Sequence, residues 1–164
     1  MAKKSAGILV YRKTGKYYEV LLVHPGGPFW EKKDINSWSV PKGEIDQSEE
    51  PLRAALREFK EETGFEVKGD FIELKPVKQP SGKMIYTWAI ESDIDAGNII
   101  SNNFELEWPP KSGQYKQFPE VDRAEWFPFG KARNKIVKGQ ILILEELARI
   151  LGTGNTITLF SEQE

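Results

Sequence analysis

PKGEIDQSEEPLRAALREFKEETGF, residues 41–65, is the most informative segment of this 164-residue chain. It predicts a turn at Gly43, then a short loop, then one helix. Ser48 is the expected N-cap, and Pro51 fits the first helical turn because a proline there removes no hydrogen bond that the helix needs. Gly64 is the expected end of the helix, since glycine readily adopts the left-handed conformation found there.

At 100° per residue, one face of this helix is apolar and a separate arc is acidic. The residues of the apolar stripe, expected to face a core, are Leu52, Ala55, Leu56, Phe59 and Thr63. Glu58, Glu61 and Glu62 share the acidic arc, where each like-charged pair destabilises a helix by roughly 0.2–0.5 kcal/mol. A solvated acidic face is one interpretation. A site for a hard divalent cation is the other, because Mg²⁺ and Mn²⁺ take oxygen ligands.

The spacing of the charged residues favours the metal interpretation. A pattern of seven fixed residues and two apolar positions runs without a gap through Gly43, Glu49, Arg57, Glu58, Phe59, Glu61, Glu62, Gly64 and Phe65. This pattern resembles the signature of the Nudix hydrolases. At average residue usage a chance match is on the order of 10⁻⁸ per start position, so the pattern is a specific signal.

The order of expected elements and the resemblance imply the same fold. Strands, a helix, more strands and a second helix predict an α/β class, and the resemblance implies a Nudix-type α/β/α sandwich with a central mixed β-sheet. The activity it implies is hydrolysis of a nucleoside diphosphate linked to another group. The implied cofactor is Mg²⁺ or Mn²⁺, held by Glu58, Glu61 and Glu62, with backbone oxygens near Lys42 and Gly43 completing the shell. Such ions neutralise phosphate charge and lower the pKa of bound water.

Two further carboxylate roles follow. Arg57 and Glu49 are eight residues apart, and an ion pair between them would hold the loop against the helix and keep the metal-binding carboxylates in register. The general base stays open among Glu58, Glu61 and a carboxylate from a later loop. Family members often carry an acidic residue near the metals, ahead of a Trp-Phe pair. Glu120 is the first candidate for that position, followed by Glu125 and Glu105.

Residues around the first loop are candidates for substrate binding. The run from Trp38 to Gly43 resembles the Trp-x-x-Pro-Lys-Gly of Nudix members that split dinucleoside polyphosphates, which implies that Lys42 contacts phosphate. Residues 24–30 (HPGGPFW) break regular structure and form either an irregular connection or a loop beside the phosphates. On the second reading the possible donors are His24, Lys32 and Lys33. Trp30 and Trp38 are either core residues or surfaces for stacking a base, and Tyr86 is a further candidate for substrate binding.

The remaining chain supplies the scaffold. Strands are expected at 6–11, 18–24, 38–42, 67–76, 84–91, 104–108 and 121–128, with a hairpin loop at 14–16 and a polar loop at 112–120. A helix at about 139–151 has an apolar stripe that would pack on the sheet. Residues 156–160 form either a terminal strand or a docking tail. We expect one Nudix domain over residues 1–164, with its signature at 43–65.

Composition limits the class of protein. The absence of cysteine excludes a disulfide framework and cysteine zinc sites, and one histidine disfavours a histidine-based metal site. No apolar run approaches a membrane span, and no signal peptide is recognised at the N-terminus. A cytoplasmic protein is therefore expected, with no membrane partner. The net charge of −2 makes a nucleic-acid partner unlikely, and the oligomeric state cannot be read.

The expected function is Mg²⁺-dependent pyrophosphohydrolysis of a dinucleoside polyphosphate or a nucleoside triphosphate. An ADP-ribose-type pyrophosphatase is an alternative, weakly supported by Pro80 at a fitting distance from the signature. A non-catalytic nucleotide-sensing module is a second alternative, although no signature carboxylate is missing. An RNA cap-processing enzyme is a third, and it would call for a basic groove.

Overall fold

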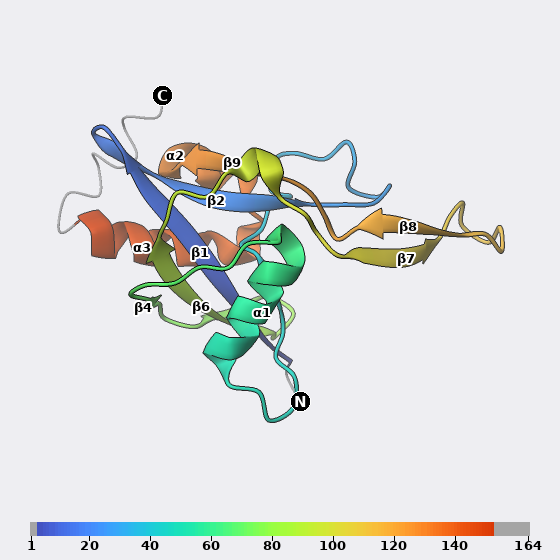
Figure 1. The fold of residues 1–164 in the computed structure, drawn as a ribbon, viewed down its shortest axis with the longest axis horizontal. Helices are drawn as coiled ribbons and strands as arrows, with labels where there is room; N and C mark the ends of the chain where they lie inside the picture. Colours follow the sequence, from blue (N-terminus) through green and yellow to red (C-terminus); the bar gives the residue numbers. More distant parts are fainter. Residues whose placement is uncertain (1–2, 153–164) are drawn as a thin grey trace.

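The computed structural model describes residues 3–152 of the chain. The strands are β1 Lys4–Thr14, β2 Tyr17–Pro25, β3 Lys42–Glu44, β4 Ile72–Glu73, β5 Val77–Lys78, β6 Met84–Glu91, β7 Asn103–Glu107, β8 Tyr115–Pro119 and β9 Val121–Pro128. The helices are α1 Pro51–Thr63, α2 Phe129–Lys135 and α3 Ile141–Gly152, and the 3₁₀ turns are η1 Ala96–Asn98 and η2 Lys138–Gln140. The expected α/β class and mixed sheet are confirmed (Figure 1).

The sheet is built around β1, with strand order β4-β6-β1-β2-β9. β1 pairs in parallel with β6 and antiparallel with two other strands, β3 along its first half and β2 along its second. Gly7 is required where β1 meets the segment before β3, because a Cβ there would lie 2.7 Å from the carbonyl oxygen of Pro41. The N-terminal strand thereby holds the start of the signature segment against the sheet.

Both faces of the sheet are covered. Side chains alternate along β1, so that Leu9 packs in the cluster shared with α2 and α3, while Ile8 and Val10 pack in the cluster shared with α1. Phe59 of α1 is fully buried on its side, and Leu144 of α3 is fully buried on the other. This confirms the predicted α/β/α layers and the buried central strands.

Helix α1 begins and ends close to the predicted positions. Pro51 is in the first turn as predicted, and Gly64 ends the helix with φ 81°, donating its N–H to the carbonyl of Lys60 at 2.8 Å. The predicted N-cap at Ser48 is wrong, since Glu50 occupies that position and no side chain caps the helix. The predicted turn at Gly43 is also wrong, because Gly43 lies within β3 and pairs with Ala6.

Three other predictions need correction. The strand expected at 67–76 is reduced to the two-residue β4, and the separate β5 follows it. The strand expected at 38–42 is only a pair of isolated bridges before β3. The loop expected at 112–120 contains β8, which pairs with β7 from Asn103↔Pro119 to Glu107↔Tyr115. The possible strand at 156–160 lies outside the described residues.

The β7–β8 hairpin projects away from the main sheet as an arm (Figure 1). Its base lies next to the loop that follows β2, because Gly26 donates its N–H to the carbonyl of Glu120 at 2.9 Å. Within residues 3–152, none of the helices is long and apolar enough to span a membrane.

Candidate active site

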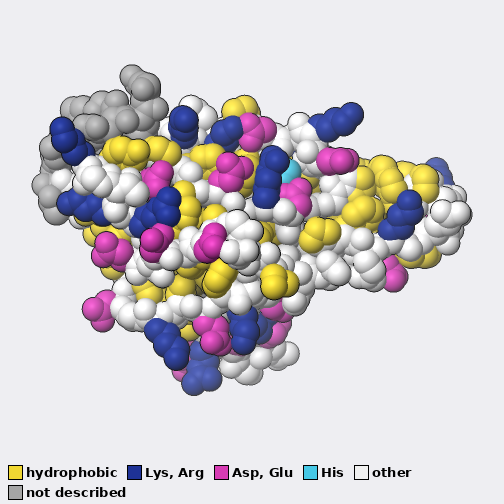
Figure 2. All heavy atoms as spheres, turned by 45° about the horizontal axis from the view of Figure 1, so that its top comes forward, with side chains coloured by type: hydrophobic (Ala, Val, Ile, Leu, Met, Phe, Trp, Pro, Cys, Tyr) yellow, Lys and Arg dark blue, Asp and Glu magenta, His cyan; other side chains and the backbone are white. Residues whose placement is uncertain are grey.

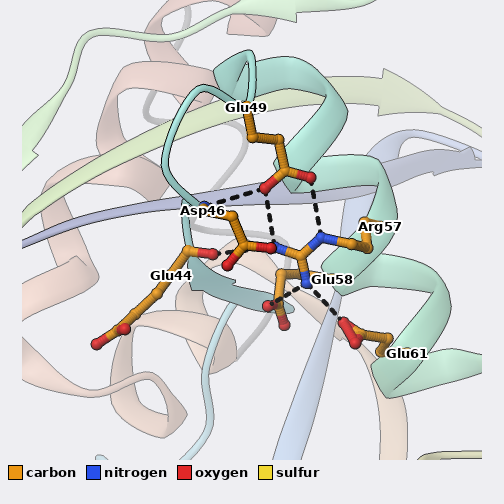
Figure 3. Close-up of polar contacts among 6 residues, drawn as sticks. All are labelled: Glu44, Asp46, Glu49, Arg57, Glu58 and Glu61. Atoms are coloured by element: carbon orange, nitrogen blue, oxygen red, sulfur yellow. Dashed lines mark hydrogen bonds and ion pairs between the residues drawn. The ribbon is translucent and has the colours of Figure 1, made fainter.

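Arg57 is the centre of a network of carboxylates on α1 and the loop before it (Figure 3). Its Nε and Nη2 donate to the two oxygens of Glu49 at 2.9 and 3.0 Å, the bidentate form of the predicted ion pair. Its Nη1 donates to Glu58 Oε1 at 3.0 Å and to Glu61 Oε2 at 2.9 Å. These bonds raise the pKa of Arg57, mainly through Glu49, and lower the pKa of Glu49. Arg57 thus orients two glutamates of the acidic arc through one hydrogen bond each.

Arg57 also fastens the loop that leads into the helix. Its Nη2 donates to the carbonyl oxygen of Glu44 at 3.1 Å and lies 3.5 Å from Asp46 Oδ2. Asp46 and Glu49 close a turn through an N–H···O bond of 3.1 Å to the Glu49 carboxylate. Strand β3, the loop and α1 therefore meet at a single guanidinium group.

Gly43 lies against the carboxyl group of Glu58. A Cβ on Gly43 would be 2.0 Å from Glu58 Cδ and 2.1–2.3 Å from both carboxyl oxygens. Because real Cβ atoms do not approach other atoms so closely, any side chain at position 43 would displace this carboxyl. The glycine and the glutamate, fifteen positions apart in the sequence, form one structural unit.

Glu62 is half-buried beside Lys42. The pKa of Glu62 is raised to about 8, chiefly by burial and further by repulsion from Glu58 and Glu120, while Lys42 partly offsets the rise. Burial, and then repulsion from Lys83, lowers the pKa of Lys42. The positive charge of Lys42 is therefore too small to compensate the burial of the Glu62 carboxyl and its repulsion by the other glutamates.

Glu120 reaches this cluster through a chain of backbone hydrogen bonds. The N–H of Asn102 donates to the carbonyl of Glu61 at 2.7 Å, and the N–H of Glu120 donates to the carbonyl of Asn102 at 2.8 Å. The pKa of Glu120 is raised by burial and by repulsion from Glu61, and the pKa of Glu58 is raised by burial and by the same neighbour. Repulsion between their charges links four carboxylates, hereafter the carboxylate cluster: Glu58, Glu61, Glu62 and Glu120.

The donor set fits a hard divalent cation. Half-buried, mutually repelling carboxylates are stabilised by a bound cation, and oxygen is the ligand that Mg²⁺, Mn²⁺ and Ca²⁺ prefer. Within residues 3–152, however, no three Asp, Glu, His or Cys side chains are already arranged to ligate a metal ion. Arg57 takes one oxygen of Glu58 and one of Glu61. Side-chain rotation within the cluster would therefore accompany metal binding.

Comparisons with known proteins identify the family to which this chain belongs. The sequence model of the NUDIX domain matches residues 1–147. An RNA pyrophosphohydrolase of Brucella anthropi is 34% identical over 157 residues, covering 86% of this chain and 84% of the relative. This chain belongs to the NUDIX family.

Further relatives carry two names, one of them shared with the Brucella protein. The asymmetrical bis(5′-nucleosyl)-tetraphosphatase of Rattus norvegicus is 30% identical, over 74% of this chain and 89% of its own length. An RNA pyrophosphohydrolase of Bartonella henselae is 39% identical, but the match spans only 38% of this chain and 35% of the relative. The crystal structure of the Caenorhabditis elegans Ap4A hydrolase binary complex aligns with a TM-score of 0.62 at 22% identity, over 93% and 99% of the two chains. At that identity the structural match establishes the fold alone.

Two candidates for substrate binding are withdrawn. His24 is fully buried, with Nδ1 2.9 Å from Asp122 Oδ1 and Nε2 2.6 Å from the carbonyl oxygen of Lys33, so neither ring nitrogen faces a ligand. Trp38 is 1% exposed and donates its Nε1–H to Asp34 at 2.8 Å. It is a core residue of this NUDIX protein and offers no stacking surface. His24 and Trp38 pack edge to face at 5.1 Å.

The other candidates lie on separate elements of the fold. Lys32 and Lys33 are exposed in the loop after β2, where Lys33 Nζ lies 4.9 Å from the ring of the partly exposed Trp30. Tyr86 is half-buried in β6, paired with Ala6. Glu105 accepts from Gln117 within the hairpin arm, and Glu125 pairs with Arg123 on β9. Neither Glu105 nor Glu125 is among the residues that shift the pKa values of Glu58, Glu62 and Glu120.

Sequence reasoning missed Asp46 and Asn102. Asp46 has a weak sequence signal, since it lies in the loop ahead of the helix. Asn102 has none, because its contribution is a backbone bridge between α1 and Glu120, which is set by tertiary structure.

Proposed function

We propose that this NUDIX protein is a Mg²⁺-dependent pyrophosphohydrolase that cleaves a phosphoanhydride bond in a nucleoside diphosphate derivative. The observation that carries the proposal is the carboxylate cluster, whose burial and repulsion raise the pKa of Glu58, Glu62 and Glu120. Perturbed carboxylates of this kind gather at catalytic and metal sites. Dinucleoside polyphosphates lead as substrates, followed by nucleoside triphosphates, on the strength of the Trp38-to-Gly43 run and the tetraphosphatase relative. Residues 1–164 are proposed to form one domain.

Glu58, Glu61 and Glu62 would hold the metal, with the backbone oxygens of Lys42 and Gly43 as further ligands. A bound Mg²⁺ or Mn²⁺ would supply charge neutralisation and a more acidic water. Gly43 leaves room for the Glu58 carboxyl beside β3, where that carboxyl would be free to hold the metal. The half-buried Lys42 would place its ammonium group against a phosphate oxygen.

Arg57 and Glu49 act as positioning residues in this proposal. Their bidentate pair fixes the loop, and the remaining Nη1 of Arg57 holds one oxygen each of Glu58 and Glu61. The proton of the attacking water would pass to Glu58, Glu61 or Glu120. Of the three, Glu120 alone comes from outside α1, so it can approach the substrate from another side.

RNA carrying a 5′-triphosphate is the second candidate substrate. The observation that favours it is the 34% identical relative named RNA pyrophosphohydrolase, which matches along most of both chains. The net charge of −2 speaks against a long nucleic-acid footprint, so contact would be confined to the 5′ end. An ADP-ribose-type activity and a non-catalytic nucleotide sensor remain weaker alternatives.

A product-release screen with Mg²⁺ and with Mn²⁺ tests the proposal. The panel holds diadenosine tetraphosphate, ATP, ADP-ribose, NADH and a 5′-triphosphorylated RNA oligonucleotide. We expect hydrolysis that stops with EDTA, and Glu62→Gln should lower kcat at least 10²-fold, because a neutral amide is a poor ligand for a hard cation. Glu66→Gln is the matched control, since Glu66 is exposed and pairs with the exposed Lys60. Undiminished turnover by Glu62→Gln would refute the assignment.

A further inference from the structure

A cavity of about 360 Å³ lies between the hairpin arm and the loop that follows β2. Its apolar lining comes from Pro28 on the loop side and from Trp108, Phe118 and Pro119 on the arm side. This volume is at the lower end of the usual range for ligand pockets, roughly 300–1,000 Å³. Figure 2 shows hydrophobic side chains gathered on the projecting arm. The cavity is therefore open, partly aromatic and of a size that suits one small planar group.

The walls of the cavity are held by aromatic contacts. Phe29 packs edge to face on Trp108 with ring centroids 5.3 Å apart, and Phe104 lies 6.0 Å from Phe118. Gly27, with φ 97°, allows the loop to approach the arm, because a Cβ there would be 3.0 Å from Phe104 Cζ. A two-stranded hairpin alone is marginally stable, so these contacts fix the arm relative to the loop.

The lining of the cavity is continuous along the chain with Glu120 of the carboxylate cluster. Pro119, which lines it, directly precedes Glu120, and the carbonyl of Glu120 accepts the N–H of Gly26 at 2.9 Å. One short segment of chain thus carries an apolar wall and a cluster carboxylate. A substrate whose phosphates reach the cluster would have its next group beside Trp108 and Phe118.

The charges around the cavity favour a base over a phosphate. Glu31 and Asp122 line it, against one cation, Lys116. Two carboxylates would repel a phosphate but accept hydrogen bonds from ring or amino N–H groups. Aromatic walls stack on any nucleobase, worth about 1–3 kcal/mol per base.

We propose that this cavity binds a nucleobase of the substrate, stacked against Trp108 and Phe118, while the phosphate chain extends past Glu120 to the carboxylate cluster. The inference rests on the proposed function and deepens it by placing the nucleoside. It makes the arm a determinant of substrate choice.

Photo-labelling of the full chain with 8-azido-ATP tests the location without requiring catalysis. We expect labelled peptides from residues 108–118 or from the loop at 27–31, with labelling suppressed by excess diadenosine tetraphosphate. Labelling confined to other segments would overturn the proposal. Label in the cavity of a protein that hydrolyses nothing in the panel would refute the proposed function alone. Hydrolysis with label elsewhere would refute the nucleobase site alone.

Kinetics on matched variants supply the second test. Trp108→Ala should raise KM for diadenosine tetraphosphate about tenfold with little change in kcat, since lost stacking weakens binding. Trp108→Phe should restore KM to within about threefold, because a ring is retained. Tyr115→Ala is the control, as Tyr115 is 63% exposed on the same arm and does not line the cavity. Should Trp108→Ala fail to fold, Phe118→Leu replaces it. An unchanged KM in either variant contradicts the proposal.

Discussion

Gly43 illustrates how a single residue can serve the site without serving the fold. A Cβ at this position would overlap the carboxyl group of Glu58, the mobile end of a flexible side chain. The backbone of β3 imposes no positive φ on Gly43. The requirement for glycine therefore comes from the position of the carboxyl.

Gly43→Ala is expected to lower kcat/KM by about 10²-fold, because small displacements of catalytic groups have effects of that size. The free energy of unfolding should change by less than about 1 kcal/mol, since the Glu58 side chain can rotate away. Enzyme assays and chemical denaturation of the same preparations measure both quantities. Large destabilisation with unchanged activity would show that the glycine serves the fold.

The raised pKa of Glu62 makes the stability of the folded protein depend on pH. Its pKa rises from 4.5 to about 8 in the folded chain, so between these pH values the folded state holds a proton that the unfolded state has released. Stability of the metal-free protein should therefore fall as pH rises from about 4.5 to about 8 and level off above it. Thermal unfolding in EDTA across this range measures the effect.

Glu62→Gln should flatten that decline, because glutamine does not titrate, and Glu66→Gln should leave it in place. Saturating Mg²⁺ should raise the Tm of the wild type most at the alkaline end, since the cation binds the ionised cluster of the folded state. A Glu62→Gln protein with the wild-type slope would contradict the raised pKa.

At the scale of elements, the loop after β2, the arm and α1 meet at one place. Gly26 touches Pro119, and a Cβ there would lie 2.0 Å from its carbonyl oxygen. Unlike the Glu58 carboxyl, this atom belongs to the backbone and cannot rotate away. The contact sets the distance between the loop and the bend between β8 and β9 that carries Glu120.

Gly26→Ala should therefore cost about 1–3 kcal/mol of stability, as overpacking typically does, and should also reduce kcat/KM by moving Glu120. Gly97→Ala is the matched control. Its nearest atom would be Asp95 Oδ1 at an ordinary 3.5 Å, and its stability should stay within about 0.5 kcal/mol of the wild type. Chemical denaturation and kinetics give both values, and equal behaviour of the two variants would refute the argument.

At the scale of the whole molecule, one sheet carries two hydrophobic clusters. The side chains of β1 alternate between them, so that α1 on one face and α3 on the other depend on the same strand. Loss of either layer exposes β1, and the two layers should unfold together.

Leu144→Ala, on the α3 side, should cost about 2–5 kcal/mol and shift a single transition. Leu142→Ala on the same helix, where the residue is 62% exposed, should cost less than about 0.5 kcal/mol. Urea unfolding followed by far-UV circular dichroism and by tryptophan fluorescence should give coincident curves. Two separated transitions would contradict the shared-strand argument.

The sequence by itself determined the fold class, the helix at 51–63 with its glycine end, and the family, because these depend on short-range periodicity and on spacing within one element. It also predicted the pair of Arg57 and Glu49 and the acidic arc. Tertiary structure decided the rest. His24 is buried with a contact to Asp122, 98 positions away, and Trp38 is buried with a backbone bond to Val137. A polar pattern at 112–120 became a strand only because β7 lies beside it. The position of Glu120 beside α1, and the cavity next to it, depend on backbone hydrogen bonds between distant segments, which leave no periodic trace in the chain.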